Sequence, residues 1–79
     1  MHLTFDPEFN VAYIRLRSKR GKVTTIPVSD ELNVDIDASA RVYGIELLNA
    51  NQQLGSHPVK RLVVENRRSG KTSRLALTA

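Results

Sequence analysis

Apolar and polar residues alternate along most of the first fifty positions of the chain. Near the start, the period of two runs through five apolar residues on either side of the stretch 6–10: Leu3, Phe5, Ala12, Ile14 and Leu16. Such alternation is typical of strands that bury one face, and the Asp, Pro and Asn between them favour tight turns. The pattern therefore predicts a β-hairpin over residues 3–16.

Three further strands follow by the same reasoning. Their apolar residues are Thr24, Ile26 and Val28, then Leu32, Val34 and Ile36, then Val42, Ile45 and Leu47. Gly21 is expected to supply a positive φ in the preceding turn, and Pro27 cannot donate to a ladder, which predicts an edge strand. The last strand keeps one apolar face only if a bulge near Gly44 absorbs one residue, with Tyr43 and Glu46 on the outward face.

The segment after residue 50 is harder to interpret. The stretch 49–55 is short and polar and ends in Gly, which predicts one helical turn or a loop. From His57 onward, the apolar positions fit either a helix or a hairpin turning at 67–71, and disorder of the final residues is a third option. The β-branched run 62–64 and the turn chemistry of Ser69-Gly70 favour the hairpin.

These elements predict a mainly β fold, with an α+β class as the alternative. We expect an antiparallel β-meander of about five strands, a short helical turn, and a C-terminal hairpin or tail. The 79 residues are expected to form a single small domain, with a β-sheet body at 1–50 and a basic extension at 51–79. A domain this small buries only roughly 60–65% of its extended-chain surface. A homodimer through an edge strand or the C-terminal hairpin is therefore expected.

The positive charge is concentrated in the last third of the chain. The net charge is +4, and residues 57–79 contain a single acid, Glu65, among six cations: Lys60, Arg61, Arg67, Arg68, Lys71 and Arg74. These cations are candidates for nucleic-acid contact through phosphates. No base-reading motif accompanies them, so such binding is expected to be salt-sensitive and weakly specific. A solvated tail, or an arm pairing with acids of another subunit, explains the charge equally well.

A mixed aromatic and basic patch is predicted on the outward face of the sheet. Tyr13, Arg15 and Arg17 share that face of the second strand, and Tyr43 joins them from the fifth. Tyr and Arg are frequent in the centres of protein interfaces, which makes these four residues a candidate protein interface. The alternative is that the arginines pair across strands with Asp35 or Glu46.

No catalytic, cofactor or metal site is predicted. The chain has no cysteine, which excludes disulfides, thiolate ligands and thiol catalysis. Asp35, Asp37 and Glu46 alternate outward as a solvated strand face does, whereas hard cations take six or more oxygens, usually from loops. His2 and His57 stand beside no nucleophile. An enzyme or metal-site protein using the outward carboxylates is therefore the least favoured reading.

The sequence also lacks an apolar run long enough to cross a membrane. No stretch approaches about 18 apolar residues, and no basic region followed by an apolar run opens the chain. We therefore expect a cytoplasmic protein with no membrane contact.

Three blocks of the chain resemble one known family. They are Thr4-Phe5-Asp6-Pro7-Glu8 leading into 12–16, then Val28-Ser29-Asp30, then 32–37 followed by 42–50. In order and at compatible spacing, they resemble the short prokaryotic proteins called domain of unknown function 2283. The resemblance covers about residues 3–50, with Phe5 where the family pattern has Tyr, and it leaves the basic end unexplained.

The resemblance implies a small, predominantly β protein and brings no established activity, cofactor or catalytic residue. We expect a non-catalytic protein-binding or dimerisation module. An antitoxin-like pairing with a small protein is the most concrete form of that expectation, and nucleic-acid binding through the basic end is the alternative.

Overall fold

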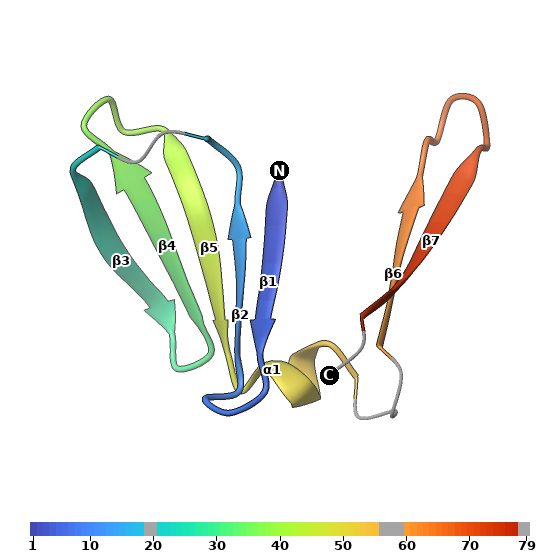
Figure 1. Cartoon of the computed structure of the whole chain (residues 1–79). Coiled ribbons are helices and arrows are strands. Elements are labelled where there is room, and N and C mark those ends of the chain that lie inside the picture. Colours follow the sequence, from blue (N-terminus) through green and yellow to red (C-terminus); the bar gives the residue numbers. More distant parts are fainter. Residues whose placement is uncertain (19–20, 56–59, 78–79) are drawn as a thin grey trace.

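The computed structural model describes residues 1–18, 21–55 and 60–77 (Figure 1). Five strands form one antiparallel sheet: β1 (His2–Asp6), β2 (Val11–Arg15), β3 (Val23–Ser29), β4 (Leu32–Asp37) and β5 (Val42–Leu48). The short helix α1 (Ala50–Gln53) follows, and β6 (Lys60–Glu65) pairs with β7 (Thr72–Leu77) as a separate hairpin. The predicted mainly β class, the helical turn and the C-terminal hairpin are confirmed.

The strands lie in the order β1-β2-β5-β4-β3, which departs from the sequential order of a meander. β5 pairs with β2, so the connection after β2 leads to β3 at the opposite edge of the sheet, as in a Greek key. This places Pro27 on an edge strand, where its missing N–H costs no ladder bond. The register of β3 shifts between Pro27 and Ser29, as an irregular edge strand requires.

The turn between β1 and β2 forms as its residues indicate. The Asp6 carboxylate accepts hydrogen bonds from the backbone N–H groups of Glu8 (2.9 Å) and Phe9 (3.2 Å), and Asn10 adopts a left-handed φ of 56°. The positive φ predicted at Gly21 is wrong, since the glycines with positive φ are Gly55 and Gly70. The connection at Gly21 crosses between distant strands, so it needs no left-handed turn residue.

The predicted bulge at Gly44 is confirmed. Asp35 pairs with Gly44 while Ile36 pairs with Val42, so Tyr43 is the extra residue on β5. The bulge keeps the apolar residues of β5 on one face of the sheet on both sides of Gly44.

The sheet has two chemically different faces. Its apolar face carries a row that crosses all five strands and a shorter row beside it: Leu3, Ile14, Ile45, Val34 and Ile26, then Phe5, Ala12, Leu47 and Leu32. Its polar face carries the intervening residues. Within the described residues, no helix is long or apolar enough to cross a bilayer.

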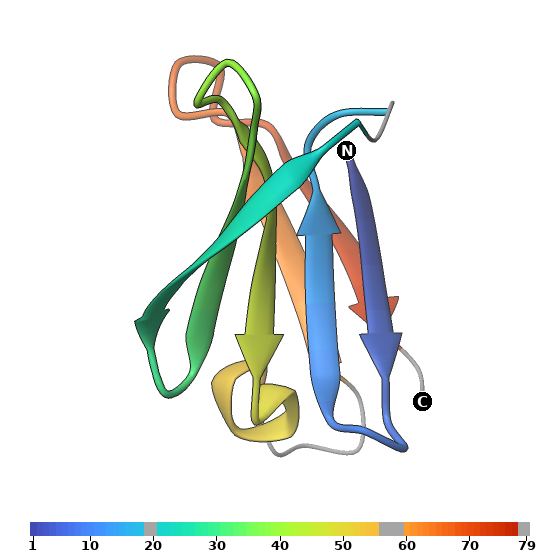
Figure 2. The same ribbon diagram turned by 90° about the vertical axis from the view of Figure 1, so that its left-hand side faces the viewer.

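The apolar face is poorly covered. Of the described residues, only Ala12, Tyr43, Gly44 and Ala50 are buried. The β6–β7 hairpin stands apart from the sheet in Figure 1 and lies behind it in Figure 2. The radius of gyration is 14.0 Å, against about 12 Å for a compact domain of this length. The chain therefore leaves open much of the surface that a compact domain would bury.

Candidate interaction surfaces

Two rows of residues run across the strands at the centre of the polar face. One row is Thr4, Tyr13, Glu46 and Asn33, and the other is His2, Arg15, Gly44, Asp35 and Thr25. Neighbouring side chains along such rows stand about 5 Å apart. Groups from strands distant in sequence therefore meet on this face.

Tyr13 spans the centre of the polar face. Its ring lies over Gly44, where an added Cβ would come within 2.6 Å of Tyr13 Cε1. The Tyr13 hydroxyl donates a 2.7 Å hydrogen bond to Asp35 Oδ2, and Thr25 Oγ1 donates a 2.6 Å bond to Asp35 Oδ1. The missing side chain at Gly44 thus lets Tyr13 join β2 to β4 across β5.

A polar cavity of about 430 Å³ opens beside this tyrosine. Three residues of the predicted patch line it, namely Tyr13, Arg15 and Tyr43. The remaining lining residues are His2, Thr4, Asp35 and Glu46. The structure therefore brings together three of the four residues predicted for a protein interface.

Neither Arg15 nor Arg17 forms an ion pair with Asp35 or Glu46 among the described residues. Asp35 is engaged by two hydroxyls, and Glu46 Oε1 accepts a 2.9 Å hydrogen bond from Asn33 Nδ2. The Arg15 side chain makes no hydrogen bond or ion pair within the described part of the chain, and the residue lines the cavity half-buried.

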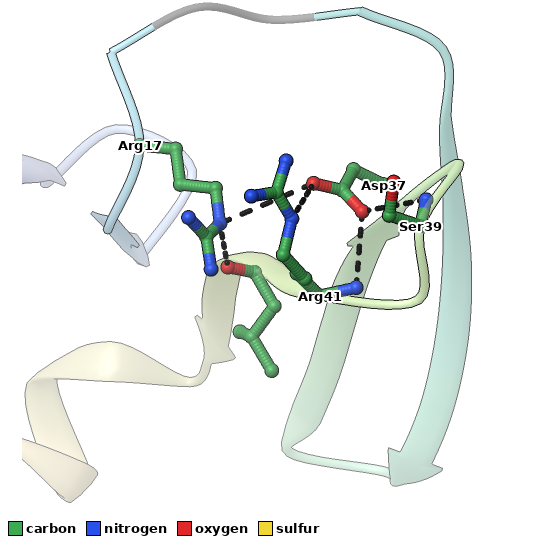
Figure 3. A network of polar contacts seen from close by, with 5 residues as sticks. Arg17, Asp37, Ser39 and Arg41 are labelled. Atoms are coloured by element: carbon green, nitrogen blue, oxygen red, sulfur yellow. Dashed lines mark hydrogen bonds and ion pairs between the residues drawn. The ribbon is translucent and has the colours of Figure 1, made fainter.

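Arg17 lies apart from the patch, because β2 ends at Arg15. Its Nε donates a 3.2 Å hydrogen bond to the carbonyl of Val42 and lies 4.0 Å from Asp37 Oδ2 (Figure 3). Asp37 Oδ1 accepts bonds from the N–H groups of Ser39 (2.9 Å) and Arg41 (3.0 Å), and Arg41 Nε lies 3.1 Å from Oδ2. Arg17 therefore belongs to a network that holds the β4–β5 turn.

The same network favours the ionised form of Asp37. The backbone N–H of Arg41 lowers the pKa of the Asp37 carboxyl below its usual value, and the Ser39 N–H and the Arg41 guanidinium act in the same direction. Asp37 is thus a turn carboxylate, separate from Asp35 and Glu46. Across residues 1–18, 21–55 and 60–77, no group of three or more His, Asp or Glu side chains is placed to hold a metal ion. His57 lies outside the described residues.

A second, apolar cavity of about 510 Å³ lies between the sheet and the hairpin. Met1, Leu3, Ile14 and Leu54 line it on the sheet side. On the hairpin side it is lined by Arg61, Leu62, Val64, Leu75 and Leu77. The strand alternation at these hairpin positions is visible in the sequence, but its placement opposite β1 and β2 is not.

The family model described as "Protein of unknown function (DUF2283)" matches residues 2–51. The chain belongs to this family. The match confirms the resemblance seen in the sequence, and it covers β1 to β5 and the start of α1. Neither the search of curated proteins nor the search of solved structures found a match.

The β6–β7 hairpin lies beyond the segment that matches the DUF2283 family model. Leu62 pairs with Leu75 and Val64 pairs with Ser73 on the face toward the cavity, whereas Val63 pairs with Arg74 on the other face. We call the first of these the inner face of the hairpin and the second its outer face. The hairpin is therefore amphipathic.

The predicted nucleic-acid residues spread over this hairpin rather than forming one row. Arg67, Arg68 and Lys71 lie in its turn, Arg74 lies on the outer face, and Arg61 also lines the apolar cavity. Lys60 begins β6, and its side chain lies outside the described part. Among the described residues, none of these cations has an acidic partner.

Proposed function

We propose that this DUF2283 protein is a non-catalytic protein-binding module. Its binding surface is the apolar face of the sheet together with the inner face of the hairpin. One observation carries the proposal. The chain exposes 6270 Å², whereas a compact monomer of 8.8 kDa exposes about 4,800 Å².

Several exposed apolar residues lie on the proposed binding surface. On the sheet, Ile26 and Val28 of β3 are 43% and 58% exposed. On the inner face of the hairpin, Val64 is 51% exposed. Covering apolar area contributes about 25 cal/mol per Å², and contiguous exposed apolar surface is typical of protein interaction sites. Occupation of this surface by protein would therefore stabilise the chain substantially.

Site-specific photo-crosslinking tests the proposal with an internal control. A photoreactive amino acid replaces either Val64 or Val63, neighbours that are 51% and 52% exposed on opposite faces of the hairpin. On irradiation in cells, we expect position 64 to give several-fold more covalent adducts to polypeptide than position 63. Equal yields, or no adducts at either position, would contradict the proposal.

The antitoxin-like form of this proposal has a specific signature in the same experiment. The adduct from position 64 would then join this chain to one small protein of a different sequence. It would recur with the same protein in independent preparations.

Nucleic-acid binding by the hairpin turn is a second candidate function. It is supported by Arg67, Arg68 and Lys71, which lie in one exposed turn with no acidic partner among the described residues. Fluorescence anisotropy with DNA and RNA oligonucleotides tests it. We expect affinity to fall steeply with salt and to weaken at least tenfold when all three cations are replaced by glutamine. Salt-independent binding, or none at low salt, would rule this function out.

A further inference from the structure

We infer that the protein seated on the apolar surface is a second copy of this chain. This inference rests on the proposed function and names its partner. The two copies are related by a two-fold axis perpendicular to the strands. In this antiparallel arrangement, the hairpin turn of each copy lies beside the end of the other copy's sheet that is far from that other copy's own hairpin turn.

The amount of open surface matches what a homodimer needs. The chain exposes 6270 Å², which exceeds the compact-monomer value by about 1,500 Å². If each copy covers that excess, the dimer buries about 3,000 Å² in total. This value falls within the range of roughly 2,000–5,000 Å² for obligate homodimers, about twice a standard interface.

Each copy also offers both halves of a matching interface. Its own hairpin faces Leu3 and Ile14 on the β1–β2 side of the sheet, where the apolar cavity lies. The β3 side is left uncovered, with Ile26 and Val28 exposed. In a two-fold dimer both subunits use the same patch, so each contact between one half of the patch and the other half of the partner's patch occurs twice. The inner face of one hairpin can thus cover the β3 half of its partner.

The charges at the two ends of the molecule favour the antiparallel arrangement. The β1–β2 and β3–β4 turns carry Asp6, Glu8, Asp30 and Glu31 and no Lys or Arg. We call this the acidic end. The hairpin turn, residues 66–71, carries three cations and no acid, and both views place it at the opposite end (Figures 1 and 2). Antiparallel copies bring opposite charges together, whereas parallel copies bring like charges together.

Sedimentation equilibrium of the full chain tests the partner directly. We expect the wild-type protein and Val63→Asp to sediment at twice the 8.8 kDa chain mass. Val64→Asp places a charge in the interface and should raise the dissociation constant at least 100-fold, while circular dichroism shows that its strands persist. Equal shifts for the two variants would overturn the inference.

A wild-type monomer throughout the micromolar range would also overturn it. That result would leave the proposed function standing if position 64 crosslinks to a different protein. Both would fail if position 64 gives no adducts at all.

Charge reversal tests the antiparallel arrangement. One variant carries Arg67→Glu and Arg68→Glu in the hairpin turn, and the other carries Glu8→Lys, Asp30→Lys and Glu31→Lys at the acidic end. A dimer of two identical variant chains then brings like charges together wherever a hairpin turn meets the other copy's β1–β2 and β3–β4 turns. A dimer of one chain of each variant brings opposite charges together at both of these contacts. Native mass spectrometry of the mixture should show the heterodimer in at least fivefold excess over either homodimer. A statistical mixture would contradict this arrangement.

Discussion

Replacing Gly44 with alanine is expected to destabilise the protein by about 2–4 kcal/mol. The new Cβ would overlap the ring of Tyr13, at 2.6 Å from Cε1, so the ring would have to leave its position over Gly44. Displacing the ring also breaks the 2.7 Å hydrogen bond from its hydroxyl to the Asp35 carboxylate. Urea denaturation followed by circular dichroism, at one fixed protein concentration, measures the change.

Gly21→Ala is the matched control for this experiment. A Cβ at Gly21 meets no atom within 4 Å, and its φ is not in the left-handed region. We expect this variant to be unchanged or slightly more stable, since alanine restricts the unfolded chain. The double variant Tyr13→Ala with Gly44→Ala should lose less stability than the two single losses added together. Equal effects of the two glycine substitutions would refute the role given to Tyr13.

Replacing Asn10 with alanine is expected to cost about 2–4 kcal/mol. The Asn10 side chain accepts a 2.7 Å hydrogen bond from the N–H of Asn51 and donates to Asn51 Oδ1 (2.8 Å) and Asn49 Oδ1 (3.2 Å). Its backbone φ of 56° is also unfavourable for alanine. The substitution would remove the side-chain hydrogen bonds between the β1–β2 turn and the α1 region, leaving the 2.9 Å bond from the Ala50 N–H to the Asn10 carbonyl. Thermal unfolding would report the loss.

Asn10→Gly separates the two contributions. Glycine tolerates the left-handed backbone but removes the three side-chain hydrogen bonds. We therefore expect Asn10→Gly to lose about 1 kcal/mol less stability than Asn10→Ala, because glycine avoids the cost of the left-handed backbone. If both variants unfolded at the wild-type temperature, the contacts of Asn10 would contribute nothing to stability.

Features that depend on nearby residues could be predicted from the sequence. The alternation of apolar and polar residues predicted the strands. The interruption of that alternation within β5 predicted the bulge at Gly44. Pro27 correctly indicated an edge strand. The turn residues between β1 and β2 behaved as expected because Asp6 and Asn10 act on their own backbone.

Features that depend on distant pairing could not be predicted in the same way. Nothing in the local pattern says that β5, rather than β3, lies beside β2, because either strand offers a suitable apolar face. The grouping of Tyr13, Arg15 and Tyr43 followed from strand alternation and the bulge. Arg17 was misplaced in that group because β2 ends two residues earlier, where alternation no longer fixes a side chain's face.

The hairpin illustrates the same limit. Its strands and turn follow from local chemistry, and the alternation of Leu62 with Val64 indicates an apolar face. That this face lies opposite Leu3 and Ile14 with a cavity between them depends on the whole chain. The separation of the basic hairpin turn from the acidic end of the sheet likewise becomes visible only in three dimensions.

The crosslinking comparison between positions 64 and 63 tests the central claim most directly. The two valines differ by one percentage point in exposure and lie on opposite faces of one hairpin. Because position 64 also faces the chain's own sheet across the apolar cavity, only adducts to a second polypeptide are counted. A several-fold excess of polypeptide adducts from position 64 is the result that the proposed interface requires. Equal yields from the two positions would show that no protein prefers the inner face, and the proposed function would be wrong.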